Sequence, residues 1–509
     1  MLVLWDHSIN QETQLPAMPN GVARVYPASG ATAMLPLTPA NNYTPTILFC
    51  GGSDMPEYSY GNYTFPFIDT WKYPASKDCQ RITPEPQDGS SPVYVADDNM
   101  LEGRTMGQFI ILPTGKLLVV NGALNGTAGY SQTTLTTPSI AAMPFGNSLA
   151  SGPVLTPAIY DPDAPQGSRW SRAGLSASQI PRLYHSSAIL LPDGSVLIAG
   201  SNPNIDVNLT TIYPTTYTAE ILYPPYFRAV TRPAPIGIPK NLSYGGPYFD
   251  ILIPASSYTG PAKDAADSAT VTIVRPGFTT HAMNMGQRHM QLNSTYTVNS
   301  DDTITLHVSQ PPPNPNLFQP GPALMFVNIL GVPSTGSYLL VGNGQIGTQP
   351  IQTVAQLPEN TQIPSATSPA TEPVATPTTS AQSTDAHGAN VIGIIIGVGI
   401  GCLALLAMVG VILGLIRNRK GRPLKEKSRQ RRRHQPISYS RSPGPRNGGA
   451  IFRHANNAGS ETFLPLQHPE DYSQTWTGPY IAETPRVSGE SFPRQVPESH
   501  YNQGRYRQY

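Results

Sequence analysis

Three related stretches, centred on Arg24, Arg104 and Arg182, constrain the fold of this chain most. Each runs from the arginine through a patch of small residues to a hydrophobic strand, a turn and a glycine-containing end. In two of them, at 112–115 and 191–194, the turn reads Leu-Pro-Thr/Asp-Gly, in which Pro and Gly supply the backbone angles of a hairpin. The arginines lie 80 and 78 residues apart, and a simple kelch unit has about 50 residues, so each unit carries loop insertions. We interpret the stretches as three or four blades of a β-propeller.

These blades, over residues 1–228, predict only part of a ring. Propellers close with about 4 to 8 blades, because an open ring leaves strand edges unpaired. The sequence also starts abruptly: residues 1–6 read as the last strand of an interrupted blade, and no signal-peptide pattern precedes them. We expect a truncated gene model or a fragment, with a genuinely shortened, non-catalytic paralogue as the alternative.

A second β-rich domain is predicted over residues 231–344. Alternating runs, such as 269–274 and 303–308, are separated by Pro, Gly, Asn and Asp. Roughly 110 residues of this kind indicate an immunoglobulin-like β-sandwich. The predicted fold class is therefore all-β.

Three further segments are predicted after the sandwich. Residues 345–390 consist mainly of Thr, Ser, Pro, Ala and Gln, a composition typical of an extended, disordered stalk. Residues 391–416 are uncharged and mostly apolar, long enough to cross a ~30 Å hydrocarbon layer as a single transmembrane helix. Residues 417–509 are rich in Ser, Pro, Gly, Arg and Tyr, which predicts a disordered tail.

The charges around the predicted helix set its orientation. Ten Lys or Arg residues fall between Arg417 and Arg433, whereas none occurs from His289 to Ile416. Positive flanks stay in the cytoplasm, so we expect a type I plasma-membrane protein with its N-terminal domains outside the cell. The basic run is interpreted as a stop-transfer anchor, with binding to anionic lipid as the second interpretation, and not as a nucleic-acid-binding patch. Six candidate N-glycosylation asparagines precede the helix and none follows it: Asn42, Asn62, Asn125, Asn208, Asn241 and Asn293.

The predicted helix also contains a spacing of small residues. Gly393, Gly397 and Gly401 recur at every fourth position, which would let two helices approach closely and dimerise. Glycine is also frequent in membrane helices that do not dimerise. Both interpretations stay open.

Two segments carry the residues best suited to chemistry. Tyr184 and His185 precede the apolar run of the third blade, and His281 follows about a hundred residues later in the second domain. Taken singly, a tyrosine or histidine beside a strand is more often a packed residue than a ligand. Adjacent strand residues also point to opposite faces, so Tyr184 and His185 reach one partner only at a strand end or bend.

Longer motifs connect these segments to a known family. They are the runs at 42–52, 102–108, 112–116, 121–126, 181–188, 279–284 and 331–334, together with Phe326. Over residues 1–345 the chain resembles the glyoxal oxidase branch of the galactose oxidase-like copper radical oxidases, and it looks like an N-terminally truncated member. This resemblance implies a kelch-type propeller followed by an early set sandwich, whose loop delivers a copper histidine into the ring.

The resemblance implies that Tyr184, His185 and His281 bind copper, and these donors suit a tetragonal Cu(II) ion. Tyr184 would be the axial tyrosine that accepts the substrate proton. The family's second tyrosine, cross-linked to a cysteine as a radical cofactor, is not encoded in this chain. Cys50 and Cys79 resemble a structural disulfide pair. Tyr26 resembles the radical tyrosine only superficially, and His289 and His307 are reserve ligand candidates.

Two functions follow as expectations. The first is a membrane-anchored copper radical oxidase that oxidises small aldehydes or primary alcohols with O₂ and releases H₂O₂, although this chain without the radical residues should be inactive. The second is a non-catalytic cell-surface binding or sensor protein.

Overall fold

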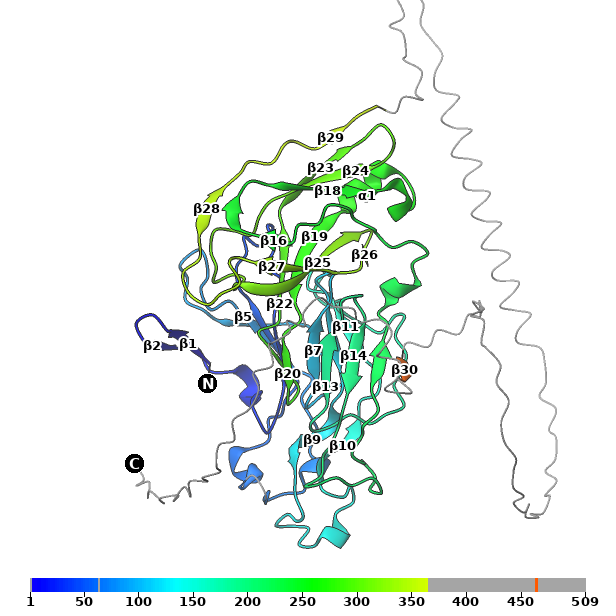
Figure 1. The fold of residues 1–509 in the computed structure, drawn as a ribbon. Coiled ribbons are helices and arrows are strands. Elements are labelled where there is room, and N and C mark those ends of the chain that lie inside the picture. The colour runs from blue at the N-terminus through cyan, green and yellow to red at the C-terminus, as the bar shows by residue number, and fades with distance from the viewer. Residues whose placement is uncertain (1, 63–64, 365–462, 466–509) are drawn as a thin grey trace, which may run out of the picture. The chain divides into compact units, whose positions relative to one another are not determined.

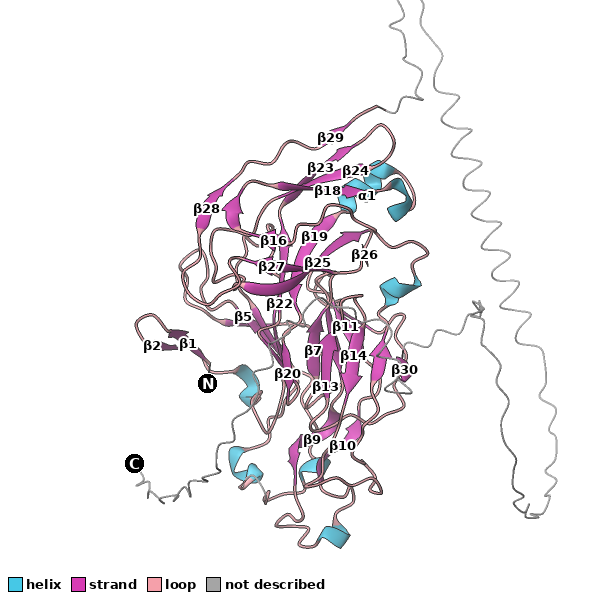
Figure 2. Ribbon diagram, viewed as in Figure 1, coloured by secondary structure: helices cyan, strands magenta, loops and turns pink. Residues whose placement is uncertain are grey.

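The computed structural model describes residues 2–62, 65–364 and 463–465. Strands dominate these ranges, and α1 (Ala262–Ser268) is the only α-helix within them (Figure 2). Single-turn 3-10 helices lie at Pro19–Gly21, Glu57–Tyr60, Thr70–Lys72, Ile140–Ala142, Pro225–Arg228 and Ala255–Ser257. The predicted all-β class is confirmed.

The first part of the chain forms antiparallel sheets that follow one another along the sequence (Figure 1). The first sheet contains β3 (Ala31–Met34), β4 (Ile47–Cys50), β5 (Cys79–Ile82) and β6 (Tyr94–Ala96). The second sheet contains β7 (Gln108–Ile111), β8 (Leu117–Val120), β11 (Ala158–Tyr160) and β12 (Trp170–Ser171). The third sheet contains β13 (Ser187–Leu190), β14 (Val196–Ala199), β15 (Glu220–Leu222) and β30 (Phe463–Pro465). A hairpin of β9 (Ala123–Tyr130) and β10 (Ser148–Pro153) is inserted between β8 and β11. Each sheet begins shortly after one of the three arginines that mark the sequence repeat.

The second sheet is buried on both faces. Alternate residues of a strand point to opposite sides: Phe109 and Ile111 pack in one hydrophobic cluster with the first sheet, whereas Ile110 packs in another with the third. All four residues of β7 and of β8 are buried. This double burial explains why residues 109–111 and 117–120 are continuous apolar runs and not alternating ones.

The three repeat arginines make the same contacts in their own sheets. Each is buried, and each donates from its guanidinium to the carbonyl oxygen of the residue directly after the second strand, namely Gly51, Asn121 and Gly200. Each also pairs with a carboxylate, Asp78 at 2.6 Å, Glu102 at 2.7 Å and Glu220 at 2.7 Å, respectively. The sequence repeat therefore corresponds to a repeated contact between the guanidinium and the end of the second strand, whereas the carboxylate partner comes from a different position in each sheet.

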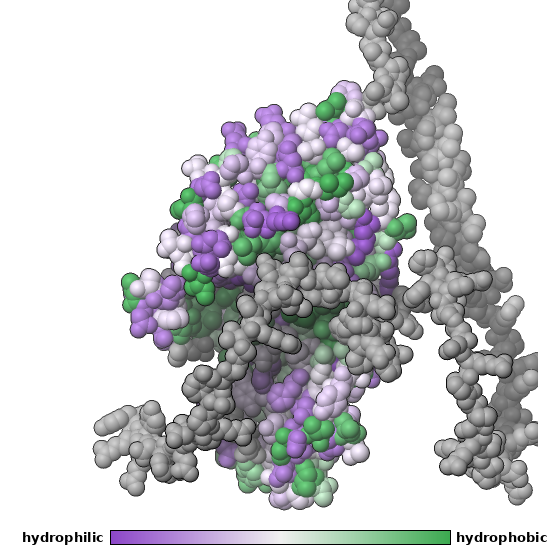
Figure 3. Space-filling view, in the orientation of Figure 1, coloured by the Kyte–Doolittle hydropathy of each residue, from purple (hydrophilic) through white to green (hydrophobic). Residues whose placement is uncertain are grey.

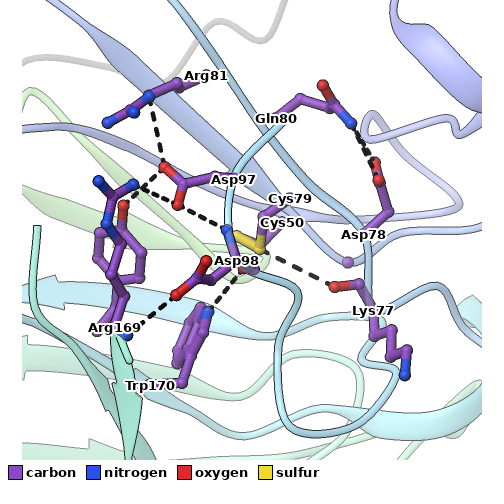
Figure 4. Close-up of a disulfide and its surroundings, with 12 residues drawn as sticks. Cys50, Lys77, Asp78, Cys79, Gln80, Arg81, Asp97, Asp98, Arg169 and Trp170 are labelled. Carbon is purple, nitrogen blue, oxygen red and sulfur yellow. Dashed lines mark hydrogen bonds and ion pairs between the residues drawn. A yellow bond between two sulfur atoms is a disulfide. The ribbon is translucent and has the colours of Figure 1, made fainter. Parts of the chain in front are cut away.

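A disulfide joins two strands of the first sheet (Figure 4). Cys50 and Cys79 face each other across β4 and β5, and their sulfur atoms are 2.01 Å apart. Nearby, the buried Asp97 carboxylate accepts a hydrogen bond from Arg169 Nη1 at 2.6 Å, and Trp170 Nε1 donates to the Asp98 carbonyl at 2.9 Å. These contacts fix the first sheet to the last strand of the second.

Residues 241–362 form a two-sheet sandwich. One sheet contains β16 (Asn241–Leu242), β27 (Ser337–Val341), β25 (Gly321–Ile329), β19 (Thr270–Arg275) and β22 (Arg288–Leu292), with β26 (Val332–Pro333) beside β25. The other sheet contains β18 (Phe249–Ile253), β24 (Ile304–Val308), β23 (Ser294–Val298) and β29 (Thr361–Gln362). Smaller pairs are β17 (Tyr244–Gly246) with β28 (Ile351–Val354), and β20 (Phe278–Thr280) with β21 (Met283–Met285). Side chains of both sheets share one core, and hydrophilic and hydrophobic residues are interspersed on the face of the sandwich shown in Figure 3.

The sandwich docks on the second sheet around the carbonyl oxygen of Pro113. This oxygen lies 3.2 Å from His289 Nε2, 3.1 Å from Thr272 Oγ1 and 3.1 Å from Asn328 Nδ2. The backbone of Leu37 also pairs with β22, through its N–H to the His289 carbonyl and its carbonyl to the Gln291 N–H. The two parts of the chain are therefore joined by buried hydrogen bonds as well as by apolar contact.

His289 gives the stability of this junction a pH dependence. Burial lowers its pKa to about 4, whereas an unfolded histidine titrates near ~6.5. Between these values the unfolded chain binds a proton that the folded chain does not, so stability falls as the pH falls, by up to about 3 kcal/mol, and the effect saturates below the folded pKa. Denaturant unfolding at pH 7, 6, 5 and 4 measures this, with His289→Gln as the non-titrating control that keeps a donor. Equal pH slopes for the two proteins would contradict it.

Three predictions about chain segments turn out differently. Part of the predicted stalk pairs with the sandwich, since β28 lies beside β17 and β29 beside β23; backbone hydrogen bonds at sheet edges hold these strands without needing apolar side chains. Part of the predicted disordered tail is the strand β30, which pairs with β15. The start of the chain, β1 (Val3–Asp6), forms an exposed hairpin with β2 (Gln11–Gln14) and not a blade strand.

The predicted type I topology and cell-surface location stay predictions from sequence. The predicted helix 391–416 and its Gly393, Gly397 and Gly401 lie outside the described residues. No helix within the described residues is long and apolar enough to span a membrane. The membrane anchor and helix dimer stay predictions from sequence.

Candidate metal centre

Tyr184 and His185 lie in a turn just before β13. His185 has a positive φ of 64°, so the chain bends between the two residues and their side chains do not take opposite faces. The segment after β14 supports this turn, because the Asn202 N–H donates to the Tyr184 carbonyl at 2.9 Å. A Cβ on Gly200 would lie only 2.5 Å from the His185 carbonyl oxygen, so this close approach requires glycine. Because of this bend, the adjacent Tyr184 and His185 can face one partner, which two neighbouring residues of a regular strand cannot do.

His281 lies at the tip of the β20–β21 hairpin. His281 and Ala282 form its two-residue loop, with φ values of 48° and 64°, as in a type I′ turn. Such angles are costly for residues with a Cβ, and they occur mainly where the surrounding structure imposes them, often at functional sites. Figure 1 shows the hairpin leaving the sandwich and running beside the sheets of the first domain, where β20 contacts β13 and β21 contacts β7.

The structure brings the three predicted ligands together. The ring centroids of Tyr184 and His185 are 3.9 Å apart, those of Tyr184 and His281 are 5.5 Å apart, and those of the two imidazoles are 5.1 Å apart. Tyr184 is half-buried, whereas His185 and His281 are exposed. The cluster is therefore open to a small molecule on the histidine side.

The donor chemistry of this cluster fits a metal ion. His185 Nδ1 lies 2.9 Å from the Asn202 carbonyl oxygen, and His281 Nδ1 lies 2.7 Å from Thr280 Oγ1. In each imidazole one nitrogen is thus engaged by the protein and Nε2 stays available, the arrangement typical of metal-bound histidine. Within the described ranges no three His, Cys, Asp or Glu side chains gather as a metal site, and the side chain beside the two imidazoles here is the phenol of Tyr184.

The surroundings of Tyr184 keep its phenol protonated in the metal-free protein. Burial, together with the neighbouring Tyr26 hydroxyl, raises the pKa of Tyr184 to about 12. The rings of Tyr26 and Tyr130 lie 6.2 and 6.3 Å from the Tyr184 ring. Burial also lowers the pKa of His185, and His281 adds to this effect. A neutral His185 has the lone pair that a metal requires.

Tyr26 and Tyr130 are neighbours of Tyr184 that the sequence does not predict. The sequence around Tyr26 resembles that of the family's radical tyrosine only superficially, and Tyr130 lies in none of the family motifs. Neither lies near Tyr184 in the sequence, so no spacing or motif signals the contact. Only the packing of the sheets shows it.

The remaining predicted residues lie away from the cluster. His289 is bonded to Pro113, and His307 Nδ1 pairs with Asp250 at 2.7 Å, so both reserve candidates have structural partners. Asn42, Asn62, Asn241 and Asn293 are exposed and Asn208 is partly exposed. Asn125 is a poor glycosylation site, because it is half-buried in β9 with its Nδ2 3.3 Å from Ser151 Oγ, and Thr127 of its motif is buried.

Two family descriptions match this architecture. "Glyoxal oxidase N-terminus" matches residues 2–226, and "Galactose oxidase-like, Early set domain" matches residues 232–341. The chain is built from these two domains of the glyoxal and galactose oxidases. Their boundary falls between the third sheet of this glyoxal oxidase-type domain and the sandwich.

Named relatives agree with the two domains. Aldehyde oxidase GLOX1 of Arabidopsis thaliana is 33% identical over 344 residues, which are 64% of this chain and 49% of that protein. Aldehyde oxidase GLOX of Vitis pseudoreticulata is 32% identical over 342 residues, 66% of this chain and 58% of that protein. The chain thus spans about half the length of these relatives. A solved structure titled "Novel fungal alcohol oxidase with catalytic diversity among the AA5 family, in complex with copper" is 20% identical, with a TM-score of 0.43, over 61% of this chain and 53% of that one.

Proposed function

We propose that this glyoxal oxidase-type chain carries the copper-binding half of an oxidase that acts on small aldehydes or primary alcohols. The convergence of Tyr184, His185 and His281 carries this proposal. The overall reaction is RCH₂OH + O₂ → RCHO + H₂O₂, or RCHO + H₂O + O₂ → RCOOH + H₂O₂. The two aldehyde oxidase relatives support the substrate class.

Each residue has a separate role in this proposal. The Nε2 atoms of His185 and His281 would hold the copper, and Tyr184 would contribute its phenol oxygen. Bound copper would supply one-electron redox chemistry. Tyr184 has to give up its phenol proton when it becomes a ligand, and the resulting phenolate oxygen is the base that takes the hydroxyl proton of the substrate. Tyr26, beside it, is placed to donate to that oxygen.

The chain on its own is proposed to bind copper without turnover. In the family a tyrosine cross-linked to a cysteine carries the second electron. Cys50 and Cys79 are bonded to each other, so no free thiol is present in the described residues. A loaded but catalytically silent site is the expected state of this chain.

Copper titration of the purified chain tests the proposal. We expect one equivalent of Cu(II) to bind with the electron paramagnetic resonance spectrum of a tetragonal site and a phenolate-to-copper absorption band. Tyr184→Phe should lose that band while retaining the metal on the two histidines. A chain that takes up no Cu(II) would instead favour the non-catalytic surface protein, and an unchanged band in Tyr184→Phe would remove Tyr184 from the ligands.

A further inference from the structure

Gln108 connects the two elements that carry the histidines. It is the first residue of β7 and is fully buried in the second sheet. One histidine-bearing element, β13, belongs to the third sheet, and the other, the β20–β21 hairpin, belongs to the sandwich. The side-chain amide of Gln108 bonds to both.

Towards β13, Gln108 binds the backbone of one residue from both sides. Its Oε1 accepts from the Ala188 N–H at 2.9 Å, and its Nε2 donates to the Ala188 carbonyl at 2.9 Å. Ala188 is the third residue after His185. The side chain thus replaces a neighbouring strand for β13 at the point where that strand leaves the Tyr184–His185 turn.

Towards the hairpin, the same Nε2 lies 2.7 Å from Thr279 Oγ1 and 3.1 Å from Asn284 Oδ1. Thr279 and Asn284 face each other across β20 and β21, one step from the pair that flanks the loop bearing His281. Both hairpin strands are therefore held within a few residues of the imidazole.

The base of the hairpin is fixed to the same strand. Gln287 Nε2 donates to the Phe109 carbonyl at 2.9 Å, and the Ile111 N–H donates to Gln287 Oε1 at 3.2 Å. The strand β7 is thus a common template for the hairpin and for β13. Of the two glutamines, Gln108 is the one whose side chain bonds to both histidine-bearing elements.

We propose that Gln108 is a positioning residue that sets the separation of the His185 and His281 imidazoles. A side-chain amide offers one acceptor and two N–H donors at one end. Here the acceptor binds the Ala188 N–H, and the two N–H groups face three acceptors, the Ala188 carbonyl, Thr279 Oγ1 and Asn284 Oδ1, so one N–H is shared. The proposal rests on the proposed copper site for its metal readout, but the placement itself is a property of the metal-free fold.

The test compares three variants of the full chain. Gln108→Met removes the amide at similar volume. Thr279→Val removes one of the two contacts to the hairpin and keeps Ala188 and Asn284 bound, so it carries the test if Gln108→Met does not fold. Asn328→Leu is the matched control, because Asn328 is a buried amide that joins the sandwich to the same sheet through Pro113, away from the cluster.

Two readouts are measured, namely Cu(II) affinity with its resonance spectrum and, without metal, hydrogen exchange of residues 278–285 and 186–190. Loss of an outer-shell partner lowers metal affinity about 10- to 100-fold, which is the range expected for Gln108→Met, with an altered spectrum. Thr279→Val should show a smaller loss, and Asn328→Leu should stay within twofold of the unsubstituted chain. Exchange in both segments should speed up in Gln108→Met, exchange of residues 278–285 alone should speed up, by less, in Thr279→Val, and neither segment should change in Asn328→Leu.

Unchanged exchange and affinity in Gln108→Met, or in Thr279→Val if that is the folded variant, would overturn the proposal. Equal losses in Asn328→Leu would also overturn it, because they would show general loosening of the domains. If the unsubstituted chain binds no Cu(II), the proposed function fails, and metal-free exchange alone then decides the role of Gln108.

Discussion

Replacing Arg182 with methionine is expected to lower the free energy of unfolding by about 3–5 kcal/mol, because it leaves a buried carboxylate without its counter-ion. Arg182 and Glu220 are both almost fully buried, and Arg182 Nε and Nη2 lie 2.9 and 2.7 Å from Glu220 Oε2. Burial lowers the pKa of Arg182, and the Glu220 carboxylate opposes this shift. Denaturant unfolding at neutral pH measures the loss.

The double variant Arg182→Met/Glu220→Gln separates the buried charge from lost packing. The side chain at position 220 would then be a neutral amide, and the Ser178 hydroxyl, now 2.9 Å from both Glu220 oxygens, could still bond it. We expect more than half of the lost stability to return. A double variant as unstable as Arg182→Met would show that the arginine acts through packing and its carbonyl contacts instead.

Arg182 also connects stability to the proposed site. Its guanidinium binds the Gly200 carbonyl, and Gly200 packs closely against the His185 carbonyl. We therefore expect Arg182→Met to loosen the Tyr184–His185 turn as well as the third sheet. The equivalent arginines of the other two sheets have no such contact with the cluster.

Substituting His281 is expected to have the largest effect on metal binding. His281→Ala removes one of two imidazole ligands and should weaken Cu(II) binding by more than the ~10–100-fold that loss of an outer-shell partner costs. Isothermal titration and resonance spectra measure this loss. Because residue 281 has a positive φ, His281→Gly is a second variant that removes the ligand without backbone strain.

His307→Ala is the control for nonspecific copper uptake. His307 also lies on the sandwich, but it pairs with Asp250 and not with Tyr184. We expect its Cu(II) affinity to match that of the unsubstituted chain. Tight, unaltered binding by both His281 variants would refute the proposed ligand set.

The sequence predicts the parts of this protein that depend on local pattern. The arginine repeat with its turns predicts the three successive sheets, and alternating β-runs predict the sandwich. Continuous apolar runs at 109–111 and 117–120 come from burial on both faces, which the period of a strand alone does not distinguish from other buried segments. Tyr184, His185 and His281 are predicted as copper ligands from the family resemblance and not from their spacing.

The pairing of the edge strands β28, β29 and β30 could not be predicted from the sequence. β28 and β29 read as part of a polar stalk because edge strands are held by backbone hydrogen bonds, and these bonds leave no hydrophobic signature. β30 is three residues long, and its partner β15 lies more than two hundred residues away in the sequence. No local signal connects such segments.

By itself the sequence determined which residues are available: a phenol, two imidazoles, three arginines at a regular spacing and two cysteines. The tertiary structure decided which of them meet. A left-handed bend at His185 and a two-residue hairpin loop at His281 bring their rings together, and Gln108 holds both elements on one strand. Contacts of this kind depend on how separate sheets pack, because side chains distant in the chain become neighbours only when their backbones are fixed.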